Sequence, residues 1–160
     1  MRKFEVETAA VTILNIYNNE ICNDHETLQR NGSLFTLFLH SPLTAFCLVS
    51  KIDQISLAVW DKCQVLIEGF SQEVTRLIAS SSIIDLWYKT YLQDDFLRIL
   101  ICRFVFCNFV LRSHRKFQGN LAFLPSCQPP INFNLIMANP FLTDFVAQLA
   151  NILSVVDWLS

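Results

Sequence analysis

The hydrophobic pattern of the chain is dominated by residues 96–111, FLRILICRFVFCNFVL, where apolar side chains cover most of a helical circumference. A helix of this kind packs inside a protein, with other helices around it. The run is too short to cross a bilayer, which needs about 20 apolar residues, and it contains Arg98 and Arg103. We therefore expect a buried central helix over residues 95–112.

Amphipathic patterns predict helices before this run. Residues 4–20 place their apolar side chains on one helical face. A second helical pattern begins at Ser41-Pro42, a favourable helix start, and continues to residue 70. A break near Ser50 stays open, and Gly69 is expected to mark the end of this pattern.

Further elements are predicted on either side of the central helix. Short helices are expected over residues 71–78 and 82–91, each opened by a serine. Residues 113–138 contain three prolines and cannot form one continuous helix, and residues 131–135 alternate as an extended segment would. Asn139-Pro140 opens a clear amphipathic helix. The predicted fold is all-α, a single domain over residues 1–160 with about six or seven helices around the 95–112 helix.

Composition and charge narrow the functional classes. Hydrophobic residues make up 52% of the chain and charged residues 16%, so a substantial apolar surface should remain that needs an explanation. The net charge of −2 offers no basic stripe for phosphates, which argues against a nucleic-acid partner. The sequence shows neither a signal peptide nor a C-terminal anchor, so we expect a soluble, cytoplasmic protein without a transmembrane segment.

Candidate chemistry is sparse. None of the six cysteines forms a C-x-x-C pair, which favours free buried thiols over a disulfide framework. The Cys/His pairs at 22/25 and 40/47 lack the second pair of a strong zinc site, so no metal or cofactor is expected. Asp94-Asp95 is either a carboxylate pair or, more simply, a helix cap. The sequence therefore favours a protein that is not an enzyme.

The segment Asp95-Phe96-Leu97-Arg98-Ile99-Leu100 resembles the first homology region of the Bcl-2 family, Asn-Trp-Gly-Arg followed by apolar residues. The helix start at residues 139–145 lies where that family has its second region. Residues 48–53, with leucine followed by Ile52 and Asp53, lie where it has its upstream motif. The divergent motifs and the lack of a membrane tail look more like viral members of the family.

This resemblance implies an anti-apoptotic regulator that acts between virus and host and binds the amphipathic helices of pro-apoptotic proteins in an apolar groove. Arg98 would pair with an aspartate of the bound helix, and Phe96 and Ile99 would form the groove floor. Asp95, in the same motif, is a further candidate for partner binding. Candidates for groove wall or core are Leu48, Ile52, Val59 and Leu66. Peripheral attachment to membranes, mitochondria included, stays open. Arg98 could instead be capped by a neighbouring aspartate or point to solvent.

A second resemblance competes with the first. Phe46, Val49, Asp53-Gln54 and Leu57 are similar to the signature of nuclear-receptor ligand-binding domains. That resemblance implies a module that encloses a small apolar ligand between Val49, Leu57 and Leu66. An all-α domain of neither family is the remaining alternative.

Overall fold

The fold was analysed in a computed structural model that describes residues 34–115, 117 and 124–158. The helix predicted over residues 4–20 lies outside this part of the chain. The described residues form seven α-helices and a short 3-10 helix, with no strand among them. The elements are α3 (Leu34–His40), α4 (Pro42–Val49), α5 (Leu57–Ser80), α6 (Leu86–Tyr91), α7 (Asp95–Ser113), α8 (Phe133–Met137), α9 (Pro140–Ile152) and η2 (Val156–Trp158). The all-α prediction is confirmed.

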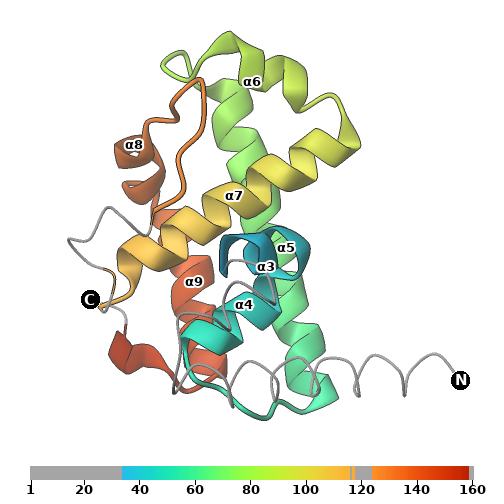
Figure 1. The fold of residues 1–160 in the computed structure, drawn as a ribbon, viewed down its shortest axis with the longest axis vertical. Coiled ribbons are helices and arrows are strands. Elements are labelled where there is room, and N and C mark those ends of the chain that lie inside the picture. Colours follow the sequence, from blue (N-terminus) through green and yellow to red (C-terminus); the bar gives the residue numbers. More distant parts are fainter. Residues whose placement is uncertain (1–33, 116, 118–123, 159–160) are drawn as a thin grey trace, which may run out of the picture.

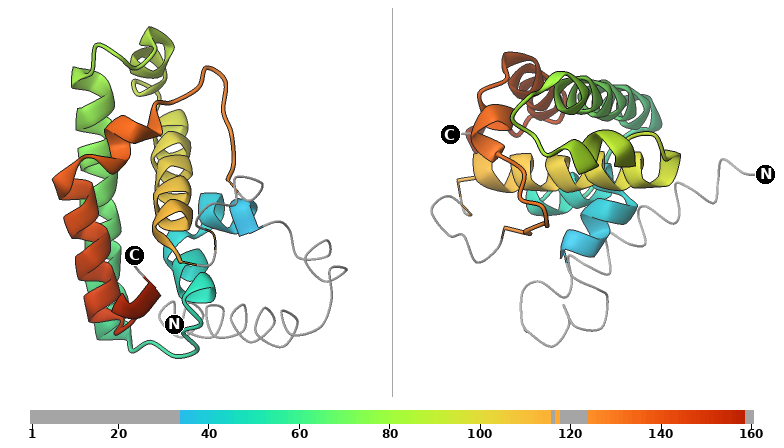
Figure 2. Two further views of the ribbon diagram at one scale, coloured as in Figure 1. Left: turned by 90° about the vertical axis from the view of Figure 1, so that its left-hand side faces the viewer. Right: turned by 90° about the horizontal axis from the view of Figure 1, so that it is seen from above.

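The helices pack around α7 (Figure 1). The long helices α5 and α9 lie side by side, and α7 lies between α5 and the short helices α3 and α4 (Figure 2). The prediction of a central helix over residues 95–112 is confirmed to within one residue at its C-terminal end.

Phe106 of α7 marks the centre of the core. Its ring lies 6.2 Å from the ring of Phe38 on α3, 6.4 Å from that of Phe46 on α4 and 5.1 Å from that of Phe70 on α5. The run from Phe104 to Leu111 is buried throughout, whereas the first turns of α7 are exposed. The helix is therefore wrapped by its neighbours over its second half, and its first half borders the surface.

The break near Ser50, which the sequence leaves open, occurs, and the backbone geometry after α4 explains it. Lys51 adopts a left-handed backbone with φ 57. The Ile52 amide then donates to the Cys47 carbonyl at 2.9 Å, and the Lys51 amide donates to the Leu48 carbonyl at 3.1 Å. These two bonds close the end of α4 as a Schellman motif. After a short linker, the Ser56 hydroxyl accepts from the Val59 amide and caps α5.

The predicted helix end at Gly69 is wrong, because α5 continues to Ser80. A Cβ atom at Gly69 would lie 2.5 Å from Cε1 of Phe145, so the glycine allows the ring of α9 to approach α5 closely. The Ser71 hydroxyl donates to the Ile67 carbonyl at 2.9 Å inside the helix and caps nothing. The short helix predicted over residues 71–78 is thus part of α5.

Asparagine and aspartate side chains cap the N-terminal ends of the later helices. Asp85, and not Ser82, caps α6 by accepting from the Trp87 amide at 2.9 Å. Asp94 caps α7, and Asn139 caps α9, as the sequence predicts. The extended segment predicted over residues 131–135 is wrong, because Asn132 caps the helical turn α8 there. In the described residues, no helix has the length and apolarity that a bilayer span requires.

Candidate functional site: a polar groove between α5 and α7

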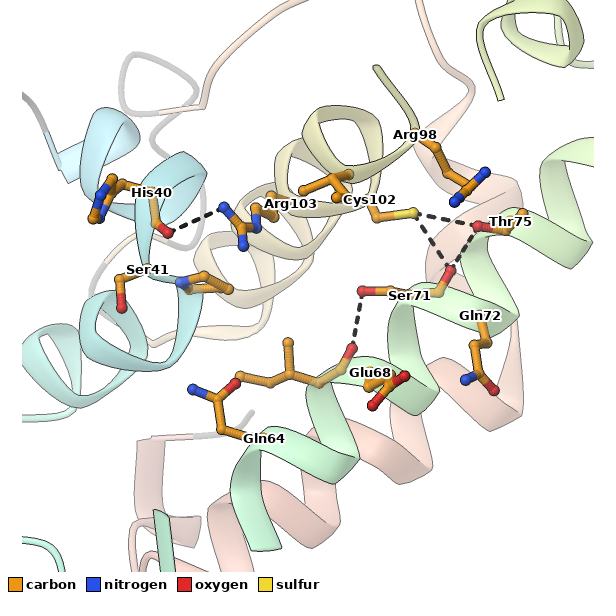
Figure 3. A pocket seen from close by; sticks show the side chains of 13 residues that line it. His40, Ser41, Gln64, Glu68, Ser71, Gln72, Thr75, Arg98, Cys102 and Arg103 are labelled. Atoms are coloured by element: carbon orange, nitrogen blue, oxygen red, sulfur yellow. Dashed lines mark hydrogen bonds between the residues drawn. The ribbon is translucent and has the colours of Figure 1, made fainter. Parts of the chain in front are cut away.

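An open groove of about 650 Å³ lies between α5 and α7 and ends at the junction of α3 and α4. Figure 3 shows its two walls, with α5 on one side and Arg98, Cys102 and Arg103 of α7 on the other. On α7 the groove runs from Arg98 to Arg103, in the first half of the helix.

The α5 wall is polar over three turns. The side chains that line it recur at helical spacing on one face of the helix: Gln64, Glu68, Ser71, Gln72 and Thr75. From the first to the last of these residues the helix rises by about 17 Å. Ile67 is the apolar member of this wall. The wall therefore offers amide, hydroxyl and carboxylate groups to a ligand.

Cys102 joins the two walls at the base of the groove. Its Sγ atom lies 3.4 Å from the Thr75 hydroxyl and 3.4 Å from the Ser71 carbonyl oxygen. The Thr75 hydroxyl also donates to the Ser71 carbonyl at 2.9 Å. Burial raises the pKa of the Cys102 thiol. A thiol with a raised pKa is a weak nucleophile at neutral pH. The two contacts of the Cys102 Sγ atom link α7 to α5.

Arg103 is fixed at the end of the groove by the last turn of α3. Its Nη1 donates to the Leu39 carbonyl at 2.7 Å and to the His40 carbonyl at 3.0 Å. These carbonyls belong to the C-terminal end of a helix, where cations are favoured. The guanidinium of Arg103 is thereby held in place at the groove.

Arg98 is held at the other end of the α7 wall. Its Nη2 donates to Oδ1 of Asp95 at 2.6 Å, and its Nη1 donates to the Leu92 carbonyl at 3.2 Å. Asp95 is 85% exposed, and the Arg98 side chain 37%. Of the alternatives left open by the sequence, Arg98 is capped by a neighbouring aspartate, and it also borders the groove.

The structure separates the predicted partner-binding residues into three groups. Arg98 and Ile99 line the groove, and Asp95 pairs with Arg98 but is not part of the groove lining. Phe96 is 67% exposed and lies outside the groove lining. The remaining four residues belong to the core or pack against it, and none lines the groove: Leu48, Ile52, Val59 and Leu66.

Neither Arg103 nor the α5 wall of the groove was predicted from the sequence. The polar stripe from Gln64 to Thr75 has a helical period that could have revealed it. The helix end wrongly predicted at Gly69 divided this stripe into two elements. No local sequence pattern marks Arg103 as a groove residue, because it contacts Leu39 and His40 of α3, which precede it by 64 and 63 residues.

The described residues contain no group of three or more side chains able to hold a metal ion. Their five cysteines are free: Cys47, Cys63, Cys102, Cys107 and Cys127. Burial raises the pKa of Cys47 and of Cys107 to about 12. These buried thiols behave as small apolar side chains.

A sequence model of the family described as Protein SCAI matches residues 3–117, which include every residue that lines the groove. The chain belongs to the SCAI family. The SCAI match also contains α3 to α7, and therefore the central helix and most of its neighbours.

Curated SCAI proteins are similar to the chain over 126 residues. Identity is 36% with Protein SCAI of Mus musculus and 35% with that of Homo sapiens, each match covering 79% of this chain and 21% of the relative. Protein SCAI homolog of Dictyostelium discoideum is 32% identical, with 79% of this chain and 16% of the relative covered. The matched segment thus spans about a fifth of these relatives or less. No solved structure matches the chain.

Membership of the SCAI family overturns both resemblances drawn from the sequence. The predictions of an anti-apoptotic viral Bcl-2 protein and of a nuclear-receptor-like ligand binder are wrong. Two residues of the motifs that suggested the Bcl-2 family have local roles: Asp95 pairs with Arg98, and Asn139 caps α9. Val49 and Leu57 belong to two helices separated by a linker, not to one continuous signature helix.

Proposed function

We propose that this chain is a protein-interaction domain without enzymatic activity, which binds a segment of a partner protein in the α5–α7 groove. The observation that carries the proposal is the open groove itself, about 650 Å³ in volume and lined by polar side chains of α5 over three turns. This volume lies within the range of about 300–1,000 Å³ that is usual for ligand sites.

The form of the groove favours a peptide. Gln64 and Gln72 present side-chain amides, which can both donate to and accept from the backbone of a bound segment. Ile99 in the groove lining is 45% exposed, and Phe96 outside the lining is 67% exposed, so an apolar side chain of the same segment would find a contact there. A long polar wall with an apolar margin suits a polypeptide better than a compact metabolite.

The described residues of the lining include one histidine, His40, and no contact joins its side chain to a nucleophilic side chain. Glu68 is the carboxylate of the lining, and it is paired with no described base or nucleophile. The Cys102 thiol has a raised pKa and already bonds to α5. These groove residues are therefore better explained by binding of a ligand than by catalysis.

Selection from a display library of random 12-residue peptides tests the proposal. Gln72→Trp would fill the groove with an indole, and it should abolish binding of the selected peptides. Val65→Trp is the matched control, because Val65 lies on α5, is 68% exposed and is not part of the groove lining. Peptides that bind both tryptophan variants equally, or a selection without binders, would contradict the proposed function.

A further inference from the structure

We propose that the outer face of α6 is a second docking surface, which binds a basic amphipathic helix of a partner protein. This surface is separate from the groove, so the inference goes beyond the proposed function. The helix lies at one end of the molecule, at the top of Figure 1. Its inner side chains pack into the core, and its outer side chains, which are also apolar, remain exposed.

Apolar side chains occupy both sides of α6. The inner stripe recurs at intervals of four and is buried in the core: Ile84, Tyr88 and Leu92. The outer face has four exposed apolar side chains: Ile83 at 68%, Leu86 at 72%, Trp87 at 61% and Tyr91 at 36%. A helix with apolar side chains on opposite sides is normally packed on both. Exposed apolar side chains gathered in this way mark an interaction site.

Two aromatic rings of the outer face are already ordered. The rings of Trp87 and Tyr91 stack with centroids 6.4 Å apart and planes 25° apart. The ring of Tyr91 also meets that of the buried Tyr88 edge-on, with centroids 6.2 Å apart. Rings held in this way lose little side-chain entropy when a partner covers them. Tryptophan and tyrosine are also typical anchors of protein interfaces.

The surface favours a helix over an extended segment. Backbone groups at both ends of α6 are already occupied, because the Asp85 side chain accepts from the Trp87 amide at 2.9 Å and the Asp94 amide donates to the Tyr91 carbonyl at 3.2 Å. An extended segment would bury its own amides and carbonyls against a mainly apolar face, which costs free energy. A partner helix satisfies its backbone internally and presents only side chains.

Carboxylates stand at both ends of this apolar face. Asp85 caps α6 and Asp94 caps α7, each accepting an amide through Oδ1 at 2.9 Å, and both residues are exposed. Neither makes an ion pair with the described residues. Lys89, the basic residue of α6, is half-buried. The charge of the surface therefore complements lysine or arginine side chains beside the apolar anchors of a partner helix.

The same charges argue against two other occupants of the surface. A second copy of the chain would bring the aspartates of both copies together, and like charges across an interface are unfavourable. A membrane that contains anionic lipids attracts basic segments and would repel the aspartates. A basic helix meets neither repulsion.

Fluorescence anisotropy with a labelled 18-residue model helix tests the inference. Its leucines recur at i, i+3, i+4 and i+7 to form one face, lysines flank this face, and a counterpart carries glutamate at the lysine positions. Wild-type protein should bind the lysine helix and should bind the glutamate helix at least tenfold more weakly. Trp87→Ala should weaken binding of the lysine helix about thirtyfold or more, the usual effect of removing an aromatic anchor.

The charges are tested separately by Asp85→Asn combined with Asp94→Asn. Asparagine caps helices as well as aspartate does, so this double variant loses both charges and keeps both caps. It should bind the lysine helix about two- to tenfold more weakly than wild type. Its affinity should also change less with salt concentration, because fewer charges take part.

Phe141→Ala is the matched control. Phe141 is 61% exposed, as Trp87 is, and its amide likewise donates at 2.9 Å to the side chain that caps its helix, Asn139 of α9. This variant should bind the lysine helix as wild type does. Gln72→Trp, which fills the groove, should also leave this binding unchanged, so failure of the inference is distinguishable from failure of the proposed function. Circular dichroism of each variant shows that the helices are intact.

Several results would overturn the inference. Equal binding of the lysine and glutamate helices, or no binding of the lysine helix, would show that the aspartates do not select a basic partner. Equal effects of Trp87→Ala and Phe141→Ala, or loss of binding in Gln72→Trp, would place the helix elsewhere. Self-association in analytical ultracentrifugation, or flotation with phosphatidylcholine–phosphatidylserine vesicles, that Trp87→Ala abolishes would show that a second copy or a membrane covers the surface.

Discussion

Lys51 and Ser154 adopt the left-handed backbone conformation, with φ of 57 and 56, and neither is a glycine. Each follows the C-cap residue of a helix, Lys51 at the end of α4 and Ser154 at the end of α9. The Val155 amide donates to the Ala150 carbonyl at 2.9 Å and closes α9, just as Ile52 closes α4. For residues with a Cβ atom this conformation costs about 1–2 kcal/mol. Both helix ends therefore contain some backbone strain.

Replacing Lys51 by glycine should remove that strain. Because glycine loses more backbone entropy on folding, part of the gain is offset, and Lys51→Gly should raise the free energy of unfolding by about 0.5–1 kcal/mol. Lys62→Gly, at an exposed position inside α5, is the control and should lower it by about 1 kcal/mol. Urea denaturation measures both. A loss of stability in Lys51→Gly as large as in the control would contradict the left-handed assignment.

The same residue shows a limit of sequence analysis. A glycine after a helix is a strong signal for its end, and Lys51 gives none, so the end of α4 could only be placed approximately. Gly69 led to the opposite error, a helix end predicted where α5 continues. Its role is to accommodate Phe145, a residue far away in the sequence. Glycine signals a close approach as well as a turn, and the sequence does not distinguish the two.

At the scale of elements, α5 and α9 are joined by a polar contact as well as by apolar packing. Asn139, which caps α9, also donates through Nδ2 to Oε1 of Glu73 on α5 at 3.0 Å. Arg76 donates to the same carboxylate through Nε at 2.7 Å and through Nη2 at 2.6 Å. The hydrogen bonds from Arg76, followed by the one from Asn139, lower the pKa of Glu73 from its ordinary value of 4.5.

This pKa shift predicts how stability depends on pH. Because the folded state holds Glu73 ionised more firmly than the unfolded state does, its contribution is present above about pH 4.5 and is lost as the pH falls through the lower folded value. Glu73→Gln should therefore be less stable than wild type at neutral pH, and the difference should shrink below about pH 4.5.

Urea denaturation of both proteins between neutral and acidic pH checks this dependence. Glu68→Gln is the control, because Glu68 lies on the same helix and makes no ion pair with the described residues. A difference between wild type and Glu73→Gln that stays constant with pH would show that the charge of Glu73 is not what stabilises the contact.

At the scale of the whole molecule, the core could be predicted from the sequence and the groove could not. The apolar run in α7 implies a buried helix with neighbours, and Phe106 indeed lies among rings from α3, α4 and α5. The groove results from the way α5 and α7 meet the α3–α4 junction. Its defining contact, from Arg103 to Leu39, joins residues 64 positions apart, and no local pattern specifies it.

The expected apolar surface is present, but the function assigned to it from the sequence is wrong. Exposed apolar side chains do occur at the start of α7, as the composition predicts, with Phe96, Leu97 and Ile99 at 67%, 37% and 45% exposure. Ile99 lines the polar groove and Phe96 and Leu97 do not, so these side chains do not form the apolar floor that the Bcl-2 resemblance implied. Burying polar groups of α5 under an apolar helix would cost free energy, so a polar segment is the better occupant.

The central claim, that the α5–α7 groove is the binding site, is tested most directly by amide chemical-shift mapping with a peptide selected from the random 12-residue library. Addition of the peptide to isotope-labelled protein should shift amide signals from Gln64 to Thr75 on α5 and from Arg98 to Arg103 on α7. The amides of α9, on the other side of α5, should stay unchanged. Shifts confined to α9 or to α6, or no shift at millimolar peptide, would contradict the account.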